Sequence, residues 1–487
     1  MSYTLPCLSR RTPFPLLLWT SSLTLLAIFI AGCGGGGTGT TLSGDTQVVV
    51  LASSTANDQL SSFTTTLQSL TLTDQSGKTV NLLASPVSEE FIHLNGHVEP
   101  IATVSIPRGT YVSANATYNG ATPVCNAQTS GSNETDTLTG GANETINLPN
   151  PITVDGTAMG LVLDLKVSTY PGQCPTPAEY PTAPPVTAAF DLTPLTIAAQ
   201  PTSSTNGLAL GLEGTISSVG SGAAELTVNG LVNGQTPPTW QVGLNSSTVV
   251  QGISGVAQLT TKLPVDMDVA IQPDGSLMAT RISAISTETT TLTVANGPLM
   301  TVSSAEPVTY IIGAAQQGYL PTGMGGFGYG NFGKSQFQAS GQFKNQASLP
   351  FAATFNSATM VPGQNVTVTT QATADMPDPL YFPLTTIVLR PQTINGTVSA
   401  ISSEGGFNTY TVTLAPYDLF PQFAMQPGQT TLLTDPNTVV VYADSNTQML
   451  NQSSPAVGSI FRFYGLVFND NGTMRMDCAQ INDGVTE

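Results

Sequence analysis

The chain has 487 residues, of which 40% are hydrophobic and only 9% are charged, so it can form apolar cores and is not a disordered protein. Acidic residues outnumber basic ones by 30 to 12, which gives a formal net charge of −18 at pH 7. A surface of this charge repels phosphate backbones and anionic lipid headgroups, so nucleic acid is excluded as a partner. The length allows three or four domains of ordinary size.

The first 32 residues have the layout of an export signal. Arg10 and Arg11 precede an apolar stretch from Leu16 to Ile30, and no acidic residue occurs before Cys33. Hydroxyl residues interrupt this stretch, which is shorter than the roughly 20 residues that a transmembrane helix needs. The pattern therefore favours a cleaved signal peptide over a membrane span.

The stretch from Ile30 to Cys33 resembles the bacterial lipobox. The resemblance implies that residues 1–32 are removed and that the Cys33 thiol carries a diacylglyceryl group at the new N-terminus. Two or more acyl chains hold a protein on a bilayer where one does not. An incidental cysteine after an uncleaved anchor is the alternative. Gly34 stands where enterobacterial sorting uses aspartate for the inner membrane, which favours the outer membrane.

Residues 33–45 are rich in glycine and threonine and are expected to form a tether. No strand precedes the four glycines and no helix follows them, so the segment does not fit a phosphate-binding loop. A coil from Cys33 to Gln47 would span on the order of 20 Å. The tether would hold a folded body away from the membrane.

Residues 46–200 are expected to form a β-sandwich. Alternating and β-branched runs recur here, separated by turn sequences such as Asp74 to Gly77. Three stretches, Leu67 to Leu72, Ile106 to Tyr111 and Gly160 to Leu165, resemble domain of unknown function 4382, a bacterial envelope family. The resemblance implies a prealbumin-like or immunoglobulin-like sandwich.

An internal repeat follows this segment. Gly214 to Val219 returns as Gly396 to Ile401, 182 residues later, which leaves room for two units of about 90 residues. Leu292 to Val294, Pro362 to Val368 and Thr386 to Leu389 fit a divergent middle copy. Three β-barrel-like repeats are therefore expected, at residues 208–285, 286–390 and 391–487.

This pattern resembles the bacterial domain of unknown function 5666 over about Leu208 to Ile481. The resemblance implies small six-stranded barrels, similar to oligonucleotide/oligosaccharide-binding folds, and no established activity. Asp266 departs from the pattern, because the family usually has a glycine there. Beyond the signal, no window keeps the apolar spacing of a helix, so the predicted class is all-β.

The middle repeat contains a glycine-rich segment, Gly318 to Lys334, which is expected to be a mobile inserted loop. Its two overlapping matches to Gly-x-Gly-x-x-Gly follow from glycine content, and no helix follows that could bind a pyrophosphate. Its aromatic side chains are candidate contacts for a sugar or a partner. They are Tyr319, Phe327, Tyr329 and Phe332.

Three cysteines remain after Cys7 and Cys33. Cys125 and Cys174 lie in Pro/Gly-rich segments of one predicted domain, and an exported protein meets an oxidising environment, so they are candidates for a disulfide. The paired and the unpaired state both stay open. Cys478 is expected to be a buried small hydrophobe in a last strand.

No catalytic residue, metal site or cofactor is assigned. Neither Gly-x-Ser-x-Gly nor His-Glu-x-x-His occurs in the chain. The two histidines, His93 and His97, would lie about 13 Å apart on one strand, too far to share a metal. A turn at Asn95 and Gly96 is the arrangement that would bring them together.

Asp266 and Asp268 form a carboxylate pair on a predicted strand beside a turn, where a solvated surface position is expected.

The leading hypothesis is a lipid-anchored, non-enzymatic binding or scaffolding protein of the bacterial cell envelope. Its partners would be the membrane, through the anchor, and an envelope glycan or protein. The rival is a carbohydrate-active or metal-dependent enzyme whose site spans the N-terminal domain and the first repeat. A cleft that gathers two carboxylates, or both histidines with a third ligand, would favour the rival. Filled barrels with flat exteriors would favour a scaffold.

Overall fold

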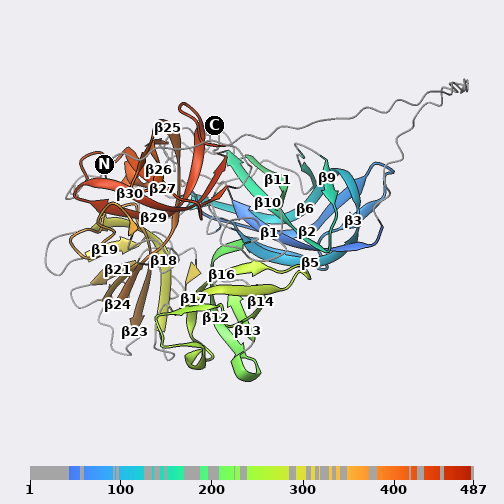
Figure 1. Ribbon diagram of the computed structural model, residues 1–487, viewed down its shortest axis with the longest axis horizontal. Coiled ribbons are helices and arrows are strands. Elements are labelled where there is room, and N and C mark those ends of the chain that lie inside the picture. Colours follow the sequence, from blue (N-terminus) through green and yellow to red (C-terminus); the bar gives the residue numbers. More distant parts are fainter. Residues whose placement is uncertain are drawn as a thin grey trace, which may run out of the picture. The chain divides into compact units, whose positions relative to one another are not determined.

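A computed structural model shows that the protein is nearly all β, as the sequence predicts (Figure 1). Among the described residues the one α-helix is α1 (Leu419–Ala424), and no helix there has both the length and the apolar character needed to cross a lipid bilayer. The structure describes residues 43–54, 60–91, 94, 98–125, 134–135, 143–146, 148, 151–168, 187–195, 208–223, 225–230, 238–284, 292–302, 309–312, 317–318, 328–331, 336–339, 348–371, 381–415, 418–424, 433–449 and 454–483.

The N-terminal module consists of two sheets that pack face to face. The first has the strand order β11-β10-β1-β5. Its strands are β1 (Asp45–Ser54), β5 (Glu99–Pro107), β10 (Ala158–Ser168) and β11 (Thr187–Leu195). In the second sheet β2 pairs with β3, β4 and β6, and β6 pairs with β7, β8 and β9. These are β2 (Leu60–Asp74), β3 (Thr79–Asn81), β4 (Val87–Glu90), β6 (Gly109–Cys125), β7 (Glu134–Thr135), β8 (Asn143–Ile146) and β9 (Ile152–Val154).

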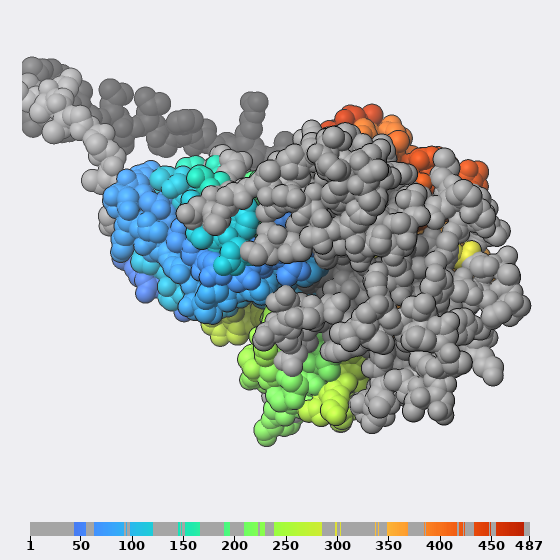
Figure 2. Space-filling view, turned by 180° about the vertical axis from the view of Figure 1, so that it is seen from behind, coloured from blue at the N-terminus to red at the C-terminus, as the bar shows by residue number. Residues whose placement is uncertain are grey.

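Alternating apolar residues of the two sheets form the core of this module. Phe63 and Leu67 of β2 pack with Leu161 and Leu163 of β10, and all four side chains are fully buried. The period-2 spacing of these core residues places them on one face of each strand. Figure 2 shows one face of the molecule, where the described surface of this module is drawn blue to cyan.

Strand β1 is buried on both faces. Val48 and Val50 belong to the core between the two sheets. Val49 and Leu51 belong to a second core, which they share with the unit formed by residues 208–284, called the first barrel unit below. A strand in this position needs a continuous apolar run, which residues 48–52 provide. The N-terminal module and the first barrel unit therefore meet through a packed core.

After the N-terminal module, one pairing pattern occurs three times. In the first unit β12 pairs with β13 and β16, β13 pairs with β14, and β17 pairs with β16, β14 and β15. The pairings among β12, β13, β14, β17 and β16 close a ring. These strands are β12 (Leu208–Val219), β13 (Glu225–Gly230), β14 (Thr239–Gly243), β15 (Val249–Gln251), β16 (Pro264–Ile271) and β17 (Leu277–Ala284).

The second and third units repeat these pairings with corresponding strands. The second unit contains β18 (Leu292–Val302), β19 (Thr309–Ile312), β20 (Gln317–Gly318), β21 (Gly328–Asn331), β22 (Gln336–Ala339), β23 (Asn365–Gln371) and β24 (Tyr381–Leu389). The third unit contains β25 (Gln392–Glu404), β26 (Phe407–Leu414), β27 (Thr438–Ala443), β28 (Gln448–Met449), β29 (Ile460–Asp470) and β30 (Thr473–Asp483).

The glycine-rich segment of the second unit is not loop throughout, which corrects the prediction for Gly318 to Lys334. Strand β21 lies within it, pairs with β19 and β24, and takes the place that β14 and β27 have in the other units. Glycine disfavours strands because it has no side chain to pack. Pairing along both edges of β21 outweighs that local preference.

Strand β29 joins the second and third units in the way that β1 joins the first two modules. Val467 belongs to the core of the third unit, whereas its neighbours Leu466 and Phe468 belong to the core of the second. The side chain of Gln364, which precedes β23, donates a hydrogen bond of 2.9 Å to the carbonyl oxygen of Val467. The third unit thus completes the core of the second.

Candidate functional site

Strand β16 carries a pair of buried carboxylates. Val265, Met267 and Val269 point into the core of the first barrel unit, so the alternate residues Asp266 and Asp268 point out of it. Asp266 is 0% exposed and Asp268 is 6% exposed. The prediction of a solvated pair is therefore wrong, because other parts of the chain cover this outer face.

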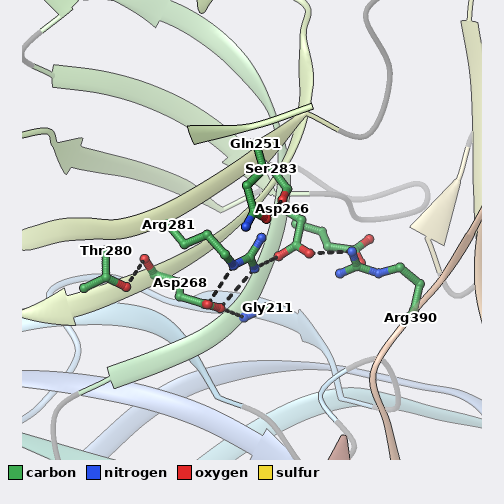
Figure 3. Close-up of polar contacts among 9 residues, drawn as sticks. Gly211, Gln251, Asp266, Asp268, Thr280, Arg281, Ser283 and Arg390 are labelled. Atoms are coloured by element: carbon green, nitrogen blue, oxygen red, sulfur yellow. Dashed lines mark hydrogen bonds and ion pairs between the residues drawn. The ribbon is translucent and has the colours of Figure 1, made fainter. Parts of the chain in front are cut away.

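Arg281 of β17 lies between the two carboxylates (Figure 3). It is opposite Asp268 in the strand register, and its Nε donates to Oδ2 of Asp268 at 2.8 Å. Its Nη2 donates to Oδ1 of Asp266, also at 2.8 Å. Asp268 Oδ1 in addition accepts a bond of 3.0 Å from the backbone N–H of Gly211.

Arg390 reaches the same cluster from the junction between β24 and β25. Its Nη1 donates to Oδ2 of Asp266 at 2.5 Å, and its Nη2 forms an ion pair with Glu213 of β12, which is opposite Asp266 in the register. The cluster thus contains three carboxylates and two guanidiniums, a formal charge of −1. It connects the first barrel unit to the segment between β24 of the second unit and β25 of the third.

Three groups of the cluster, Asp266, Arg281 and Arg390, stay charged near neutral pH. Burial by itself raises the pKa of Asp266, but Arg281 and Arg390 lower it more, so the pKa lies well below the ordinary value. Burial lowers the pKa of both guanidiniums, and the facing carboxylates, Asp266 foremost, raise it above the ordinary value. None of these three groups exchanges a proton near neutral pH, as a general acid or base must. Their ion pairs join the first barrel unit to the segment between β24 and β25.

The third unit has the opposite charge at the corresponding position. Arg462 of β29 faces Asn395 of β25, as Asp266 of β16 faces Glu213 of β12. The buried guanidinium donates a bond of 3.2 Å to the carbonyl oxygen of Ser54, the last residue of β1. The outer face of this strand thus connects the third unit to the N-terminal module.

A groove of about 690 Å³ lies between the N-terminal module and the first barrel unit. Its walls are β4 and β5 on one side and β14 with the turn between β16 and β17 on the other. The side chain of Trp240 is 4% exposed, and its Nε1 donates a bond of 2.9 Å to the carbonyl oxygen of Pro100. This bond ties the two walls together.

The turn at one end of the groove is packed closely against β1 and β5. Gly275 has a φ of 82°, which favours glycine, and a Cβ there would lie 3.2 Å from Cβ of Gln47 and 3.5 Å from Cγ2 of Thr103. The Asp274 carboxylate accepts bonds from the backbone N–H and the hydroxyl of Ser276, at 2.9 and 2.6 Å. The turn is therefore fixed both internally and by its neighbours.

The part of the groove lining that the structure describes is uncharged. It consists of hydroxyl, amide, proline and other apolar residues, and none of these described residues is ionisable. Thr66 and Ser88 share a hydrogen bond of 2.6 Å between their hydroxyl oxygens. Gln241 is exposed, and its Oε1 accepts a bond of 3.1 Å from the hydroxyl of Thr227.

Most of the residues singled out in the sequence lie outside the described part of the chain. Cys33, Cys174 and both histidines do so entirely. Cys125 is the last residue of β6 and Tyr329 lies in β21, but their side chains are not described. The other three aromatic candidates, Tyr319, Phe327 and Phe332, lie outside the described residues. The lipidation, the disulfide and the aromatic contacts therefore stay predictions.

The expectation for Cys478 is confirmed. Its thiol lies in β30 among the core residues of the third unit, and burial raises its pKa well above the ordinary value. Within the ranges that the structure describes, no three His, Cys, Asp or Glu side chains are grouped so that they could hold a metal ion.

Sequence reasoning did not find the groove or Arg390. Each depends on segments that are far apart in the chain, since Arg390 and Asp266 are separated by 124 residues. One signal was present, because a chain with so few charges placed two acidic residues at alternate positions of an apolar strand.

Comparison with known proteins gives no identification. No protein-family model matches the chain, and no curated protein matches it.

Proposed function

We propose that the protein is a lipid-anchored, non-enzymatic binding or scaffolding protein of the bacterial cell envelope. The observation that carries this proposal is how its modules are joined. Strands β1 and β29 each contribute to two cores, and Arg390 forms a buried ion cluster with the first barrel unit. Breaking such a cluster leaves uncompensated buried charge, which opposes separation of the modules. A body of this kind suits the presentation of a binding surface.

The lipid anchor supplies the location. Removal of a signal that contains Arg10 and Arg11 and no acidic residue lowers the formal charge from −18 to −20. Such a body is repelled by anionic headgroups, so it needs acyl chains to stay at a bilayer. The thiol of Cys33 in its lipobox-like setting, followed by the glycine-rich tether, fits this need, and we place the protein at the outer membrane rather than the inner.

Kinship with domains of unknown function 4382 and 5666 is part of this proposal. The recurrence of one strand-pairing pattern in three successive units supports the kinship with domain of unknown function 5666.

The anchor is tested by mass spectrometry of the protein purified from its bacterial membrane. The expected N-terminus is Cys33 with a diacylglyceryl group, and the Cys33→Ser variant should be soluble or keep its first 32 residues. A membrane-bound protein that starts at an unmodified Met1 would contradict the anchor. So would a cytosolic protein with a bare thiol at residue 33.

The rival function, a carbohydrate-active or metal-dependent enzyme, would have its site at the junction where the groove lies. Hydrolysis there would need a general acid or base or metal-binding side chains. Among the described residues, the groove lining supplies no ionisable side chain, and the carboxylates of β16 are held by arginines. The geometry therefore favours binding. Catalytic release of reducing sugars from an envelope glycan by the purified protein would reverse this preference.

A further inference from the structure

We infer that the groove between the N-terminal module and the first barrel unit binds an uncharged polysaccharide strand. The inference rests on the proposed function, since it names the ligand class of an envelope-bound binding protein. The groove of about 690 Å³ lies within the range of roughly 300–1,000 Å³ that ligand sites have.

The described residues of the groove lining carry no charge, which selects against anionic ligands. A phosphate or a uronic acid would lose hydration there without meeting an opposite charge among these residues. The overall charge of −18 further opposes polyanions. A neutral ligand meets neither penalty.

The side chains of the groove match the two faces of a sugar ring. Pro86 is exposed and Pro238 and Leu277 are partly exposed, so these residues offer apolar surface for the C–H faces of a sugar, whereas Trp240 and Pro100 are buried. Ser88, Thr103 and Gln241 carry hydroxyl or amide groups, each of which donates and accepts hydrogen bonds, as sugar hydroxyls do. Thr103 and Gln241 are exposed and so are accessible to a ligand.

An extended peptide fits the groove less well. A peptide that adds a strand to a sheet edge needs a row of backbone N–H and C=O groups. Pro86 and Pro100 have no N–H, and the carbonyl oxygen of Pro100 already accepts a bond from Trp240. Recognition along these walls therefore depends on side chains.

The walls are held in place before any ligand arrives. The Trp240–Pro100 hydrogen bond links the two modules, and the turn at Gly275 packs against Gln47 and Thr103. The core that contains Val49 and Leu51 lies beneath the same junction. A site fixed in this way loses little conformational entropy on binding.

The groove contains its own spectroscopic reporter. The chain has two tryptophans, Trp19 and Trp240, and the first lies in the predicted signal. The chain from residue 33 onward therefore has Trp240 as its single tryptophan. Trp240 lines the groove and belongs to the core of the first barrel unit, so its fluorescence responds both to a ligand in the groove and to unfolding of this unit.

The test is a fluorescence titration of the chain from residue 33 onward, with Cys33→Ser to avoid lipidation. The ligands are neutral hexasaccharides of glucose, mannose, galactose and N-acetylglucosamine. At least one is expected to change the Trp240 emission to saturation. The Gln241→Ala variant should weaken that binding about fivefold, because one neutral hydrogen-bonding group is lost. Gln258→Ala is the matched control and should bind as the parent does, because Gln258 is an exposed glutamine of the same unit whose Oε1 also accepts one bond.

Three results would overturn the inference. They are no saturable change with any neutral hexasaccharide, equal weakening by Gln241→Ala and Gln258→Ala, and saturation by polygalacturonate or a proline-rich peptide in place of the neutral sugars. If Cys33 is found lipidated while the titration fails, the proposed function stands and the ligand class is wrong. If a sugar binds but Cys33 carries no lipid, the ligand class stands and the lipid anchor of the proposed function is wrong.

Discussion

Replacement of Arg390 by methionine tests whether the buried ion cluster holds the barrel units together. The side chain of Arg390 is 4% exposed and pairs with Asp266 and Glu213. Methionine fills much of the same volume but removes the charge, so the formal charge of the cluster changes from −1 to −2. Removing one partner of a buried ion pair costs about 3–5 kcal/mol. We expect a loss of this size in the free energy of unfolding.

A second variant separates charge from packing. Combining Arg390→Met with Asp266→Asn and Glu213→Gln leaves Asp268 and Arg281 as a balanced pair. Replacing a whole buried ion group by neutral residues of similar size is often nearly neutral. The triple variant should therefore recover most of the lost stability and lie within about 2 kcal/mol of the parent.

Urea unfolding at pH 7, followed by the fluorescence of Trp240, measures both variants in the same barrel unit that carries Asp266. The losses should be alike at low and at high salt, because salt screens buried charges weakly. The reasoning is refuted if Arg390→Met loses less than about 1 kcal/mol, or if the triple variant is no more stable than the single one.

Two further predictions concern single residues of the third unit. Burial, with a smaller contribution from Asp444, raises the pKa of Asp477 from 3.8 to about 7, so the folded state takes up a proton there that the unfolded state has lost. The free energy of unfolding should fall by up to about 1.4 kcal/mol per pH unit between pH 4 and pH 7. Asp477→Asn should flatten this slope and be the more stable form at pH 8. An unchanged slope, measured by urea unfolding at a series of pH values, would contradict this. Gly396→Ala should lower the free energy of unfolding by about 1–3 kcal/mol, because its Cβ would overlap the carbonyl oxygen of Thr413. The control Gly109→Ala has open space around its Cβ and should be nearly neutral. Equal shifts of the melting temperature in the two variants would refute the argument.

Which residues of many strands face a core could be predicted from the local pattern of apolar residues. Alternation along β2 and β10 places apolar residues on one face. The run from Gln47 to Leu51 predicts a strand, but not that both of its faces are covered. The repeated glycine-led strand at Gly214 and Gly396 indicated units of one design. These signals are local because side-chain direction along a strand follows from backbone geometry alone.

The candidate site could not be predicted in the same way. The groove combines β4, β5, β14 and a turn from two modules, and its uncharged lining carries no motif. From the sequence, Asp266 and Asp268 were expected at the surface. In the structure they are buried beside Arg281 and Arg390.

By itself, the sequence determined the all-β class and which face of many strands is buried, because the strand period of two is encoded residue by residue. Only the tertiary structure decided what covers the outward faces of β1, β16 and β29, and that the glycine-rich residues of β21 form a strand. Those outcomes depend on hydrogen bonds, ion pairs and packing between segments that are distant in the chain. Local residue preference does not specify such partners, and here it was outweighed by them.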